Sequence, residues 1–337
     1  QTNKQTTMKN KILALLATIG MVSSVSAVEI NDNISINGFI DGSWSSTDYN
    51  TAGEANDDND LDIDEVELNF IVNAGNVSGE IHIDDNDDSG DLGNIEQAHF
   101  TYSFENGLSA TVGRFGSKLG FEREDPAGLY TYSRAYDDGT SIFNLGNVDS
   151  TVLEGVSLSY STDTISVSVS AINGVGDMEE SILDLPQARD SDDLNYEFAI
   201  AFTGIENLVL SAGVHAHRAS EADIAGAVDS DSDITNVHAA YTLDKLLLGA
   251  EYVNVDQDGA ADDLSAYLLL ADYDINDKMG IAVRYSEWET AANAESDRIT
   301  IAPNYAITSS LGAILEYSSA ENNTGAEEDT LALELTF

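Results

Sequence analysis

Charged side chains of both signs gather in one long stretch of the sequence, residues 113–150. Beyond the first 27 residues the chain has ten lysines and arginines (13 minus Lys4, Lys9 and Lys11), and four of these ten lie in this stretch. Elsewhere acidic residues predominate. The mixture indicates either a solvated surface loop or a loop folded inward to narrow an opening. The second interpretation gives a candidate constriction made of Arg114, Lys118, Glu122, Arg123, Glu124, Asp125 and Arg134.

The segment 85–96 has the spacing of a calcium-binding loop. Oxygen-bearing side chains stand at its positions 1, 3 and 5, Gly90 stands at position 6, and a glutamate closes it at position 12. An EF-hand also needs a helix on each side, whereas the flanking sequence here has the pattern of strands. A solvated acidic turn is therefore the alternative. The candidate ligands are Asp85, Asp87, Ser89, Asp91 and Glu96.

The composition excludes several classes of protein. A formal net charge of −48 would repel nucleic acid and anionic lipid headgroups. Hydrophobic residues make up 42% of the chain, too many for a disordered acidic protein. Cysteine is absent, so the chain has neither a disulfide framework nor a thiol metal site.

The N-terminal residues 1–27 have the pattern of a signal peptide with a short extension. Lys9 and Lys11 precede an apolar run at 12–22, and small residues at 25–27 form a cleavage site. The run is too short to span a bilayer as a helix. We predict a mature domain of residues 28–337, in which a membrane crossing would require a closed barrel.

From residue 34 onward the hydrophobic pattern has a period of two. Leu331, Leu333, Leu335 and Phe337, for example, alternate with polar or small residues, as in strands with one apolar face. We predict about sixteen strands. Their ranges are 34–45, 61–73, 76–84, 95–104, 107–116, 151–160, 164–173, 193–203, 207–217, 234–243, 245–255, 264–275, 278–288, 297–307, 310–319 and 329–337.

The predicted connections alternate between short turns and long loops. This arrangement is typical of transmembrane barrels, whose apolar face meets lipid while the polar face lines a wet interior. The connection 117–150 is then the third long loop, and we expect it to fold into the barrel. Aromatic residues just before the short turns predict an interfacial girdle: Phe104, Tyr160, Phe202, Tyr241, Tyr273 and Tyr305.

Strand parity predicts which charged residues line the interior. A charge on the lipid face costs roughly 2–4 kcal/mol at mid-membrane, so charged strand residues should face water. Arg114 shares its parity with apolar residues, yet we expect it to point inward. An acidic lining would concentrate cations. The predicted lining comprises Asp41, Glu65, Glu67, Glu80, Glu197, Glu251, Arg284, Arg298, Glu316 and Glu334.

The five histidines also fall on the inward parity. We interpret His82, His99, His215, His217 and His238 as water-exposed lining residues rather than as a metal site, because no further ligand stands at a fixed spacing. Any polar strand supplies serine, histidine and acidic residues, so the sequence gives no signal of a catalytic triad. We predict no catalytic residues, and no cofactor other than Ca²⁺.

Several segments resemble the OmpL-like outer-membrane porins. They are 95–102 (IEQAHFTY), 107–108, 113–116 (GRFG), 119–122 (LGFE), 125–126 and 133–134. The final strand, which ends in Phe337, resembles the C-terminal recognition strand of Gram-negative outer-membrane proteins. The resemblance implies location in the outer membrane of a Gram-negative bacterium, outer-membrane lipid and assembly machinery as partners, passive diffusion of small hydrophilic solutes, and often a homotrimer.

We therefore expect an all-β protein, a transmembrane antiparallel β-barrel of about sixteen strands with a long inward-folded third loop. The expected function is that of a porin for small hydrophilic solutes and ions, with a preference for cations. Two alternatives remain open. One is a non-conducting surface-binding or adhesion barrel with acidic loops that bind Ca²⁺ or partners, and the other is a soluble secreted β-protein.

Overall fold

The structure is a computed structural model, and it describes residues 27–50, 58–85, 94–122, 126–136, 152–173, 194–218, 231–258, 262–289, 295–322 and 324–337. Apart from one short 3-10 turn, η1 (Pro126–Gly128), the regular structure in these ranges is all β. A helix long and apolar enough to cross a membrane does not occur among the described residues.

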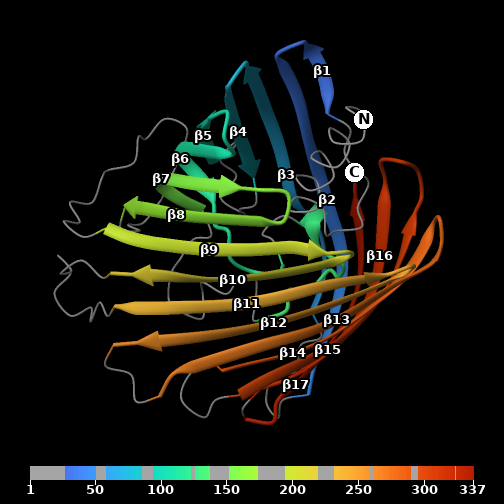
Figure 1. The fold of residues 1–337 in the computed structure, drawn as a ribbon. Coiled ribbons are helices and arrows are strands. Elements are labelled where there is room, and N and C mark those ends of the chain that lie inside the picture. Colours follow the sequence, from blue (N-terminus) through green and yellow to red (C-terminus); the bar gives the residue numbers. More distant parts are fainter. Residues whose placement is uncertain are drawn as a thin grey trace.

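Sixteen antiparallel strands, β2 to β17, form a closed ring in the described part of the chain (Figure 1). Each strand pairs with the next one along the chain, and β17 returns to β2. A short strand, β1, lies against the start of β2. The bounds are β1 (Val28–Asn31), β2 (Ile34–Tyr49), β3 (Asp58–Ala74), β4 (Val77–Asp85), β5 (Asn94–Ser103), β6 (Leu108–Gly116), β7 (Val152–Ser161), β8 (Ile165–Asn173), β9 (Leu194–Ile205), β10 (Leu208–His217), β11 (Ser232–Leu243), β12 (Leu246–Gln257), β13 (Leu264–Asn276), β14 (Met279–Glu289), β15 (Glu295–Ala306), β16 (Gly312–Glu321) and β17 (Glu327–Thr336).

The ring closes between strands from opposite ends of the chain. Thr336 pairs with Asp41, and the backbones of Phe337 and Ile40 exchange two hydrogen bonds of 2.9 Å. Because the ring is closed, it presents no long edge of unpaired backbone groups to lipid, where each such group would cost several kcal/mol.

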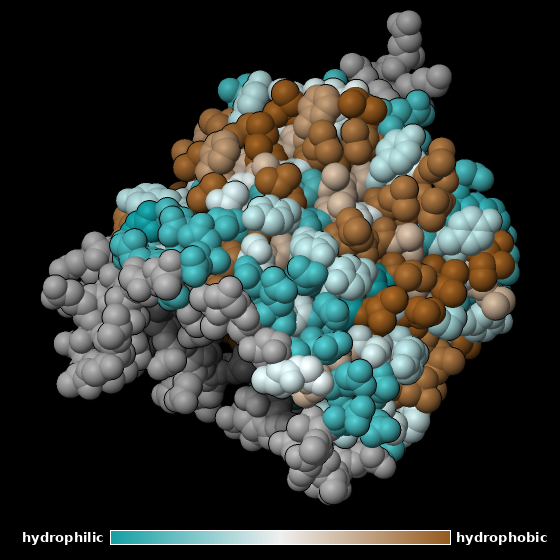
Figure 2. Space-filling model, turned by 90° about the horizontal axis from the view of Figure 1, so that it is seen from below, coloured by the Kyte–Doolittle hydropathy of each residue, from teal (hydrophilic) through white to brown (hydrophobic). Residues whose placement is uncertain are grey.

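The two faces of the barrel have opposite polarity. In β9, Leu194, Tyr196 and Phe198 are 45%, 51% and 45% exposed, whereas Asn195 and Glu197 between them are 0% and 1% exposed. Figure 2 shows broad apolar areas on the outer surface. Exposed apolar and buried polar residues are the reverse of a soluble sandwich and suit a wall that stands in lipid.

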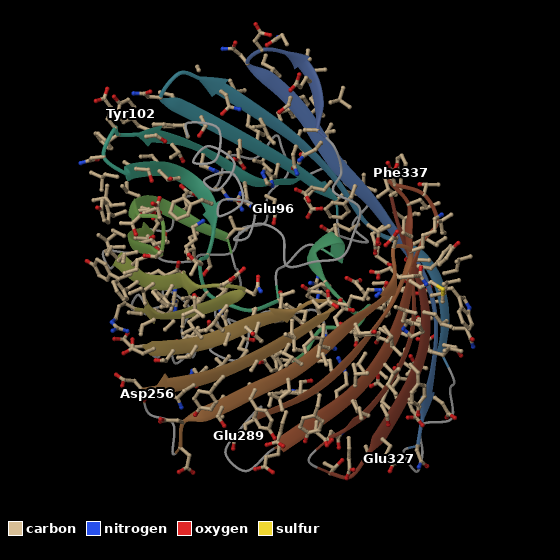
Figure 3. All side chains as sticks on the ribbon, turned by 45° about the vertical axis from the view of Figure 1, so that its right-hand side comes forward. Glu96, Tyr102, Asp256, Glu289, Glu327 and Phe337 are labelled. Carbon is tan, nitrogen blue, oxygen red and sulfur yellow. The ribbon has the colours of Figure 1, made fainter. Side chains whose placement is uncertain are left out.

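The two ends of the barrel also differ. Short turns join strands at one end, and Figure 3 shows Tyr102 and Phe337 towards it. Asp256, Glu289 and Glu327 lie at the other end, where the longer connections start. Glu96, in contrast, lies inside the barrel (Figure 3).

The sixteen strands predicted from the period-two pattern are confirmed, with differences at their ends. The strand β1 was not predicted, and β2 and β3 extend further towards the loops than expected, to Tyr49 and from Asp58. Four of the seven added residues, at 46–49 and 58–60, are aspartate or asparagine, which have low strand propensity. Pairing across the ladder, such as Thr47 with Asp58, holds them in register all the same.

Candidate functional site: an inward loop and the wall opposite it

The third long connection folds into the barrel, as the sequence predicted. Its described parts, residues 117–122 and 126–136, pack against the inner wall formed by β9 to β16. Leu119, Phe121, Tyr130 and Tyr136 are 4%, 8%, 7% and 3% exposed. They join buried wall residues such as Val253 in one apolar cluster. This interior contact fixes the loop as a second layer inside one half of the barrel.

Glu197 of β9 holds the start of the loop. Its carboxylate accepts a hydrogen bond of 2.6 Å from the Ser117 hydroxyl and one of 2.9 Å from the backbone N–H of Lys118. Carboxylate acceptors make stronger hydrogen bonds than neutral ones. Glu197 is 1% exposed, so this contact is shielded from water.

Glu251 of β12 holds the next turn of the loop. Its two oxygens accept from the backbone N–H of Phe121 at 2.6 Å and from the Tyr136 hydroxyl at 3.0 Å. The side chain of Asn236 on β11 bonds both Glu251 and the loop. Its Nδ2 donates to Glu251 at 2.7 Å, and its Oδ1 accepts from the backbone N–H of Gly120 at 3.2 Å. Burial, reinforced by the charge of Glu251, raises the pKa of the Tyr136 hydroxyl well above its usual value, so it stays a donor.

Arg284 of β14 holds the far part of the loop. It is 0% exposed and pairs with Glu122 at 2.6 Å. It also donates to the Thr131 hydroxyl at 2.7 Å and to the backbone oxygens of Ser133 and Arg134 at 2.8 and 2.7 Å. The Glu122 carboxylate also accepts a hydrogen bond of 2.8 Å from the backbone N–H of Ala135. One guanidinium thus fastens two segments of the loop to the wall.

Three further wall residues complete the attachment. Glu316 of β16 accepts from the backbone N–H of Ser133 at 3.1 and 3.2 Å. Arg298 of β15 donates to the backbone oxygen of Arg134 at 2.9 Å. On β2, the Ser43 hydroxyl bonds the Tyr132 hydroxyl at 3.2 Å. The loop is therefore anchored along an arc from β9 to β2.

Two glycines of the wall make room for the apolar side chains of the loop. A Cβ placed on Gly249 of β12 would lie 2.4 Å from the ring of Phe121. One on Gly213 of β10 would lie 2.3 Å from the side chain of Leu119. Any larger residue would fill the space that the loop occupies.

These contacts correct the predicted role of several lining residues. Interior-facing positions were expected to meet water, but the loop covers many of them, because its own backbone N–H and carbonyl groups need partners inside the barrel. The residues that are at most 8% exposed are Asp41, Glu67, Glu197, Glu251, Arg284, Arg298, Glu316 and Glu334. His215, which we expected to be exposed to water, is likewise 0% exposed.

The wall opposite the loop anchors is acidic and less covered. The side chain of Glu80 on β4 is 38% exposed, and Glu65 on β3 is half-buried. Lys118, an exposed loop residue, interacts electrostatically with Glu80 and with His99 of β5. Lys118 therefore faces the β4–β5 wall, and charges of both signs meet across this side of the interior.

Arg114 does not occupy the inward position that we expected. The ladder pairs it with Ala98 of β5 and Glu154 of β7. It shares a side of β6 with Val112, which is 37% exposed on the outer surface, whereas the next residue, Phe115, is buried inside. The ladders on both sides of β6 show no register shift, so the strand keeps its alternation up to the loop.

Some of the predicted site residues lie outside the described residues. They are Arg123, Glu124 and Asp125 of the constriction and Asp87, Ser89 and Asp91 of the calcium loop. Of the other calcium candidates, Asp85 ends β4 and Glu96 lies in β5. Calcium binding at this segment stays a prediction.

The loop anchors were not recognised from the sequence as anchors. Thr131, Ser133, Tyr132 and Tyr136 carry no motif, and their partners stand more than 85 residues away in the chain. The sequence did contain a signal for these anchors. Charged residues that face the interior need partners when they are buried, and the loop was the only long segment expected inside the barrel.

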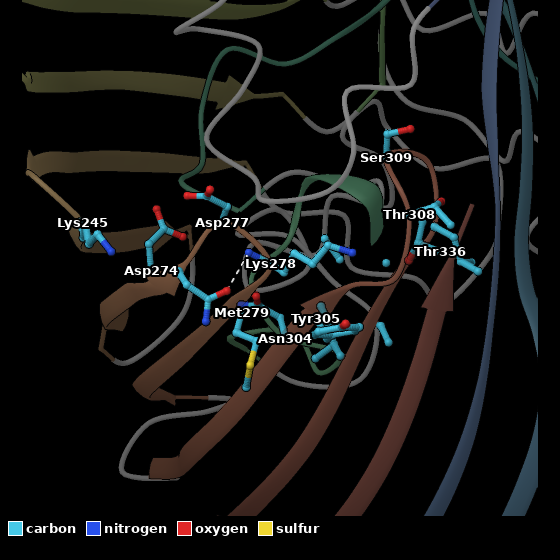
Figure 4. A pocket seen from close by; sticks show the side chains of 16 residues that line it. Lys245, Asp274, Asp277, Lys278, Met279, Asn304, Tyr305, Thr308, Ser309 and Thr336 are labelled. Atoms are coloured by element: carbon cyan, nitrogen blue, oxygen red, sulfur yellow. Dashed lines mark hydrogen bonds between the residues drawn. The ribbon is translucent and has the colours of Figure 1, made fainter.

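A pocket of about 570 Å³ opens at the short-turn end of β12 to β17 (Figure 4). Lys245, Asp274 and Lys278 lie around it, together with the buried Ile314. It is lined by turn residues and by the ends of strands, as expected at the mouth of a barrel.

The sequence matches the family described as "Putative beta-barrel porin-2, OmpL-like" over residues 34–337. The chain belongs to this family. The match covers the entire ring of strands, and the predicted OmpL-like resemblance is confirmed. No curated protein matches the sequence.

Solved structures of outer-membrane barrels share the fold. The outer membrane channel DcaP of Acinetobacter baumannii superposes with a TM-score of 0.65 at 16% identity, over 92% of this chain and 99% of that one. OmpF of Salmonella typhi gives 0.65 at 12% identity, over 92% and 100%. A loop-deletion mutant of OmpT, an outer membrane protein of Vibrio cholerae, gives 0.62 at 15%, over 91% and 100%. The OmpL-like porin is thus a protein of the Gram-negative outer membrane, as predicted.

Proposed function

We propose that this porin is an open diffusion channel for small hydrophilic solutes and ions, not a plugged binding barrel and not an enzyme. The observation that carries the proposal is the position of the loop. Its described parts are clamped to one arc of the wall by Glu197, Glu251 and Arg284. A loop fastened to one side narrows a passage without filling it.

We propose a preference for cations because carboxylates dominate the remaining wall. Four carboxylates on β3, β4 and β5 are half-buried at this part of the wall. They are Asp64, Glu65, Glu80 and Glu96. Lys118 of the loop interacts electrostatically with Glu80. A low-dielectric wall focuses the field of such charges and raises the local concentration of cations.

The proposed partners are outer-membrane lipid, small cations and solutes, and the assembly machinery that would read the strand ending in Phe337. A homotrimer is also proposed, since in-vitro folded OmpT of Vibrio cholerae, at 14% identity and a TM-score of 0.58, has a trimer form. Calcium at the segment 85–96 remains a candidate cofactor.

Conductance of the refolded protein in a planar bilayer under a KCl gradient tests the proposal. We expect open current steps and a reversal potential that favours K⁺. The double variant Glu65→Gln, Glu80→Gln should reduce this preference at unchanged folding. The matched control Asp163→Asn, in the exposed turn between β7 and β8, should not. Heat-modifiable migration on a gel establishes that each variant is a folded barrel.

Two results would overturn this function. A folded, inserted barrel that gives no steps would be a plugged binding barrel. Steps that favour Cl⁻ would show that the positive charges of the loop outweigh the wall. Repeating the recording with Ca²⁺ tests the calcium candidate separately, because block that survives the combined substitutions Asp85→Asn, Asp87→Asn, Asp91→Asn and Glu96→Gln does not come from this segment.

A further inference from the structure

We propose that Glu67, His82 and Glu96 form a binding site for a divalent first-row transition metal ion, with Zn²⁺ as the best-suited ligand. The three residues stand on β3, β4 and β5, inside the barrel and away from the loop anchors. Their ligand atoms all lie within 4.8 Å of one another. Nitrogen from histidine and oxygen from carboxylates are donors that Zn²⁺ accepts.

The distances fit a metal at the centre of the group. Nδ1 of His82 lies 3.0 Å from Oε1 of Glu67 and 3.8 Å from Oε2 of Glu96. Ligands of a tetrahedral ion with bonds of about 2.0–2.2 Å stand roughly 3.4 Å apart. The two observed distances bracket this value, so each pair that His82 forms with Glu67 and Glu96 comes within a few tenths of an ångström of it.

The fourth residue, Glu80, fixes which nitrogen of His82 faces the site. Its Oε2 lies 3.3 Å from Nε2 of His82, on the other side of the ring. If Nε2 donates its hydrogen to Glu80, the lone pair of Nδ1 points at Glu67 and Glu96. Metal-bound histidines usually donate their second ring nitrogen to a carboxylate in this way, which orients the ring and raises its basicity.

The burial of Glu67 is the independent observation. Its side chain is 1% exposed, and its Oε1 lies 3.0 Å from Nδ1 of His82, with no other donor within hydrogen-bond distance among the described residues. A carboxylate oxygen buried without a donor is costly. When the lone pair of Nδ1 faces that oxygen, a metal cation bound between the two atoms makes the contact favourable.

The backbone supports the same arrangement. In the ladder of β4 and β5, His82 pairs with Gln97 and Ile83 pairs with Ile95, so Glu96 is an extra residue in a β-bulge. Bulges re-aim side chains and are frequent beside functional sites. Here the bulge brings the Glu96 carboxylate to the side of His82, where it is 14% exposed.

The site has an entry path and a consequence. The side chains of His82 and Glu80 are 15% and 38% exposed, so an ion would reach them through the interior. A bound dication would neutralise part of the acidic wall. The bound ion should therefore reduce the preference of the channel for cations. This expected reduction rests on the proposed function, whereas metal binding itself does not.

The test measures Zn²⁺ binding to the refolded full barrel, without a polyhistidine tag and stripped with a chelator, by calorimetry at pH 7.5. We expect one saturable site per chain. His82→Gln and Glu67→Gln should each weaken it at least 100-fold, and Glu80→Gln should weaken it about 10-fold, as loss of an orienting group does. The matched control His99→Gln, on the neighbouring strand with its Nδ1 3.2 Å from the Arg114 carbonyl, should leave affinity unchanged.

Co²⁺ provides a second readout that does not depend on any variant. Its absorption in the visible range should show the intensity of a four-coordinate site with nitrogen and oxygen ligands. Absence of saturable Zn²⁺ binding by the folded wild-type barrel would overturn the proposal and leave a protonated His82 as the partner of the three carboxylates. Equal losses in His99→Gln and His82→Gln would overturn it too, since binding would then be unspecific. Neither outcome bears on whether the barrel conducts.

Discussion

At the scale of single residues, several buried charged side chains of the barrel interior bind the inward loop instead of lining a water-filled passage. Arg284 is 0% exposed and satisfies oxygens from four loop residues. Glu197 and Glu251 do the same for loop N–H groups. Buried charges persist in proteins when each has a partner, and here the partners belong to one loop.

Removing the Arg284 guanidinium should release the loop. In Arg284→Met, the carboxylate of Glu122 and the carbonyls of Ser133 and Arg134 lose their shared donor. Loss of one partner of a buried ion pair typically costs about 3–5 kcal/mol. We expect a lower free energy of unfolding in urea, together with larger and noisier current steps.

Arg218→Met is the matched control for this prediction. Arg218 pairs with Asp233 at 2.7 Å at the loop end of β10, but its side chain is 35% exposed. Exposed ion pairs contribute about 0–1 kcal/mol, so stability and conductance should barely change. Equal effects of the two substitutions would mean that Arg284 does not hold the loop.

At the scale of elements, the loop and the wall are built to fit each other. The inner faces of β10 and β12 carry glycine where Leu119 and Phe121 approach most closely. The loop in turn offers apolar side chains at these points and backbone N–H groups beside Glu197 and Glu251. Packing and hydrogen bonding therefore specify the same position for the loop.

Filling the space at Gly249 should displace the loop. A valine there would collide with the Phe121 ring, so Gly249→Val should change single-channel conductance and its fluctuation. Adding Phe121→Ala restores the space and should move conductance back towards the wild-type value. Gly79→Val is the control, because a Cβ at Gly79 would have its nearest contact at 3.5 Å. If the double variant behaves like Gly249→Val alone, the two residues do not interact.

At the scale of the whole molecule, the net charge of −48 and the acidic interior should act together on ions. Interactions between solvent-exposed charges fade over a Debye length, which is about 10 Å at 0.1 M salt and about 3 Å at 1 M. A cation preference that arises from carboxylates of the wall and the mouths should therefore weaken as salt rises.

Reversal potentials measured at a fixed tenfold KCl gradient test this dependence on salt. We expect the K⁺ preference to be strong when the dilute side is about 10 mM and to fall when it is about 300 mM, where the Debye length is shorter. Sucrose, a neutral solute, should permeate equally at both salt concentrations in a liposome-swelling assay. A preference that is independent of salt would place selectivity in a narrow, desolvated site instead.

The sequence by itself determined the barrel. Alternating residues such as Leu331, Leu333 and Leu335, with alternating turn and loop lengths, fixed sixteen strands and an outer face, because side-chain direction in a strand has a period of two. It also indicated that the segment after β6 folds inward, since charges of both signs gather there.

Only the tertiary structure decided what the inward residues do. Glu197, Glu251 and Arg284 have the same parity as Glu80, yet the loop covers the first three and leaves the fourth open. The position of Arg114 and the bulge at Glu96 also depend on register, which is set by partner strands. The period of a strand gives the side on which a residue lies, but contacts between distant segments determine whether it meets water, a loop or an ion.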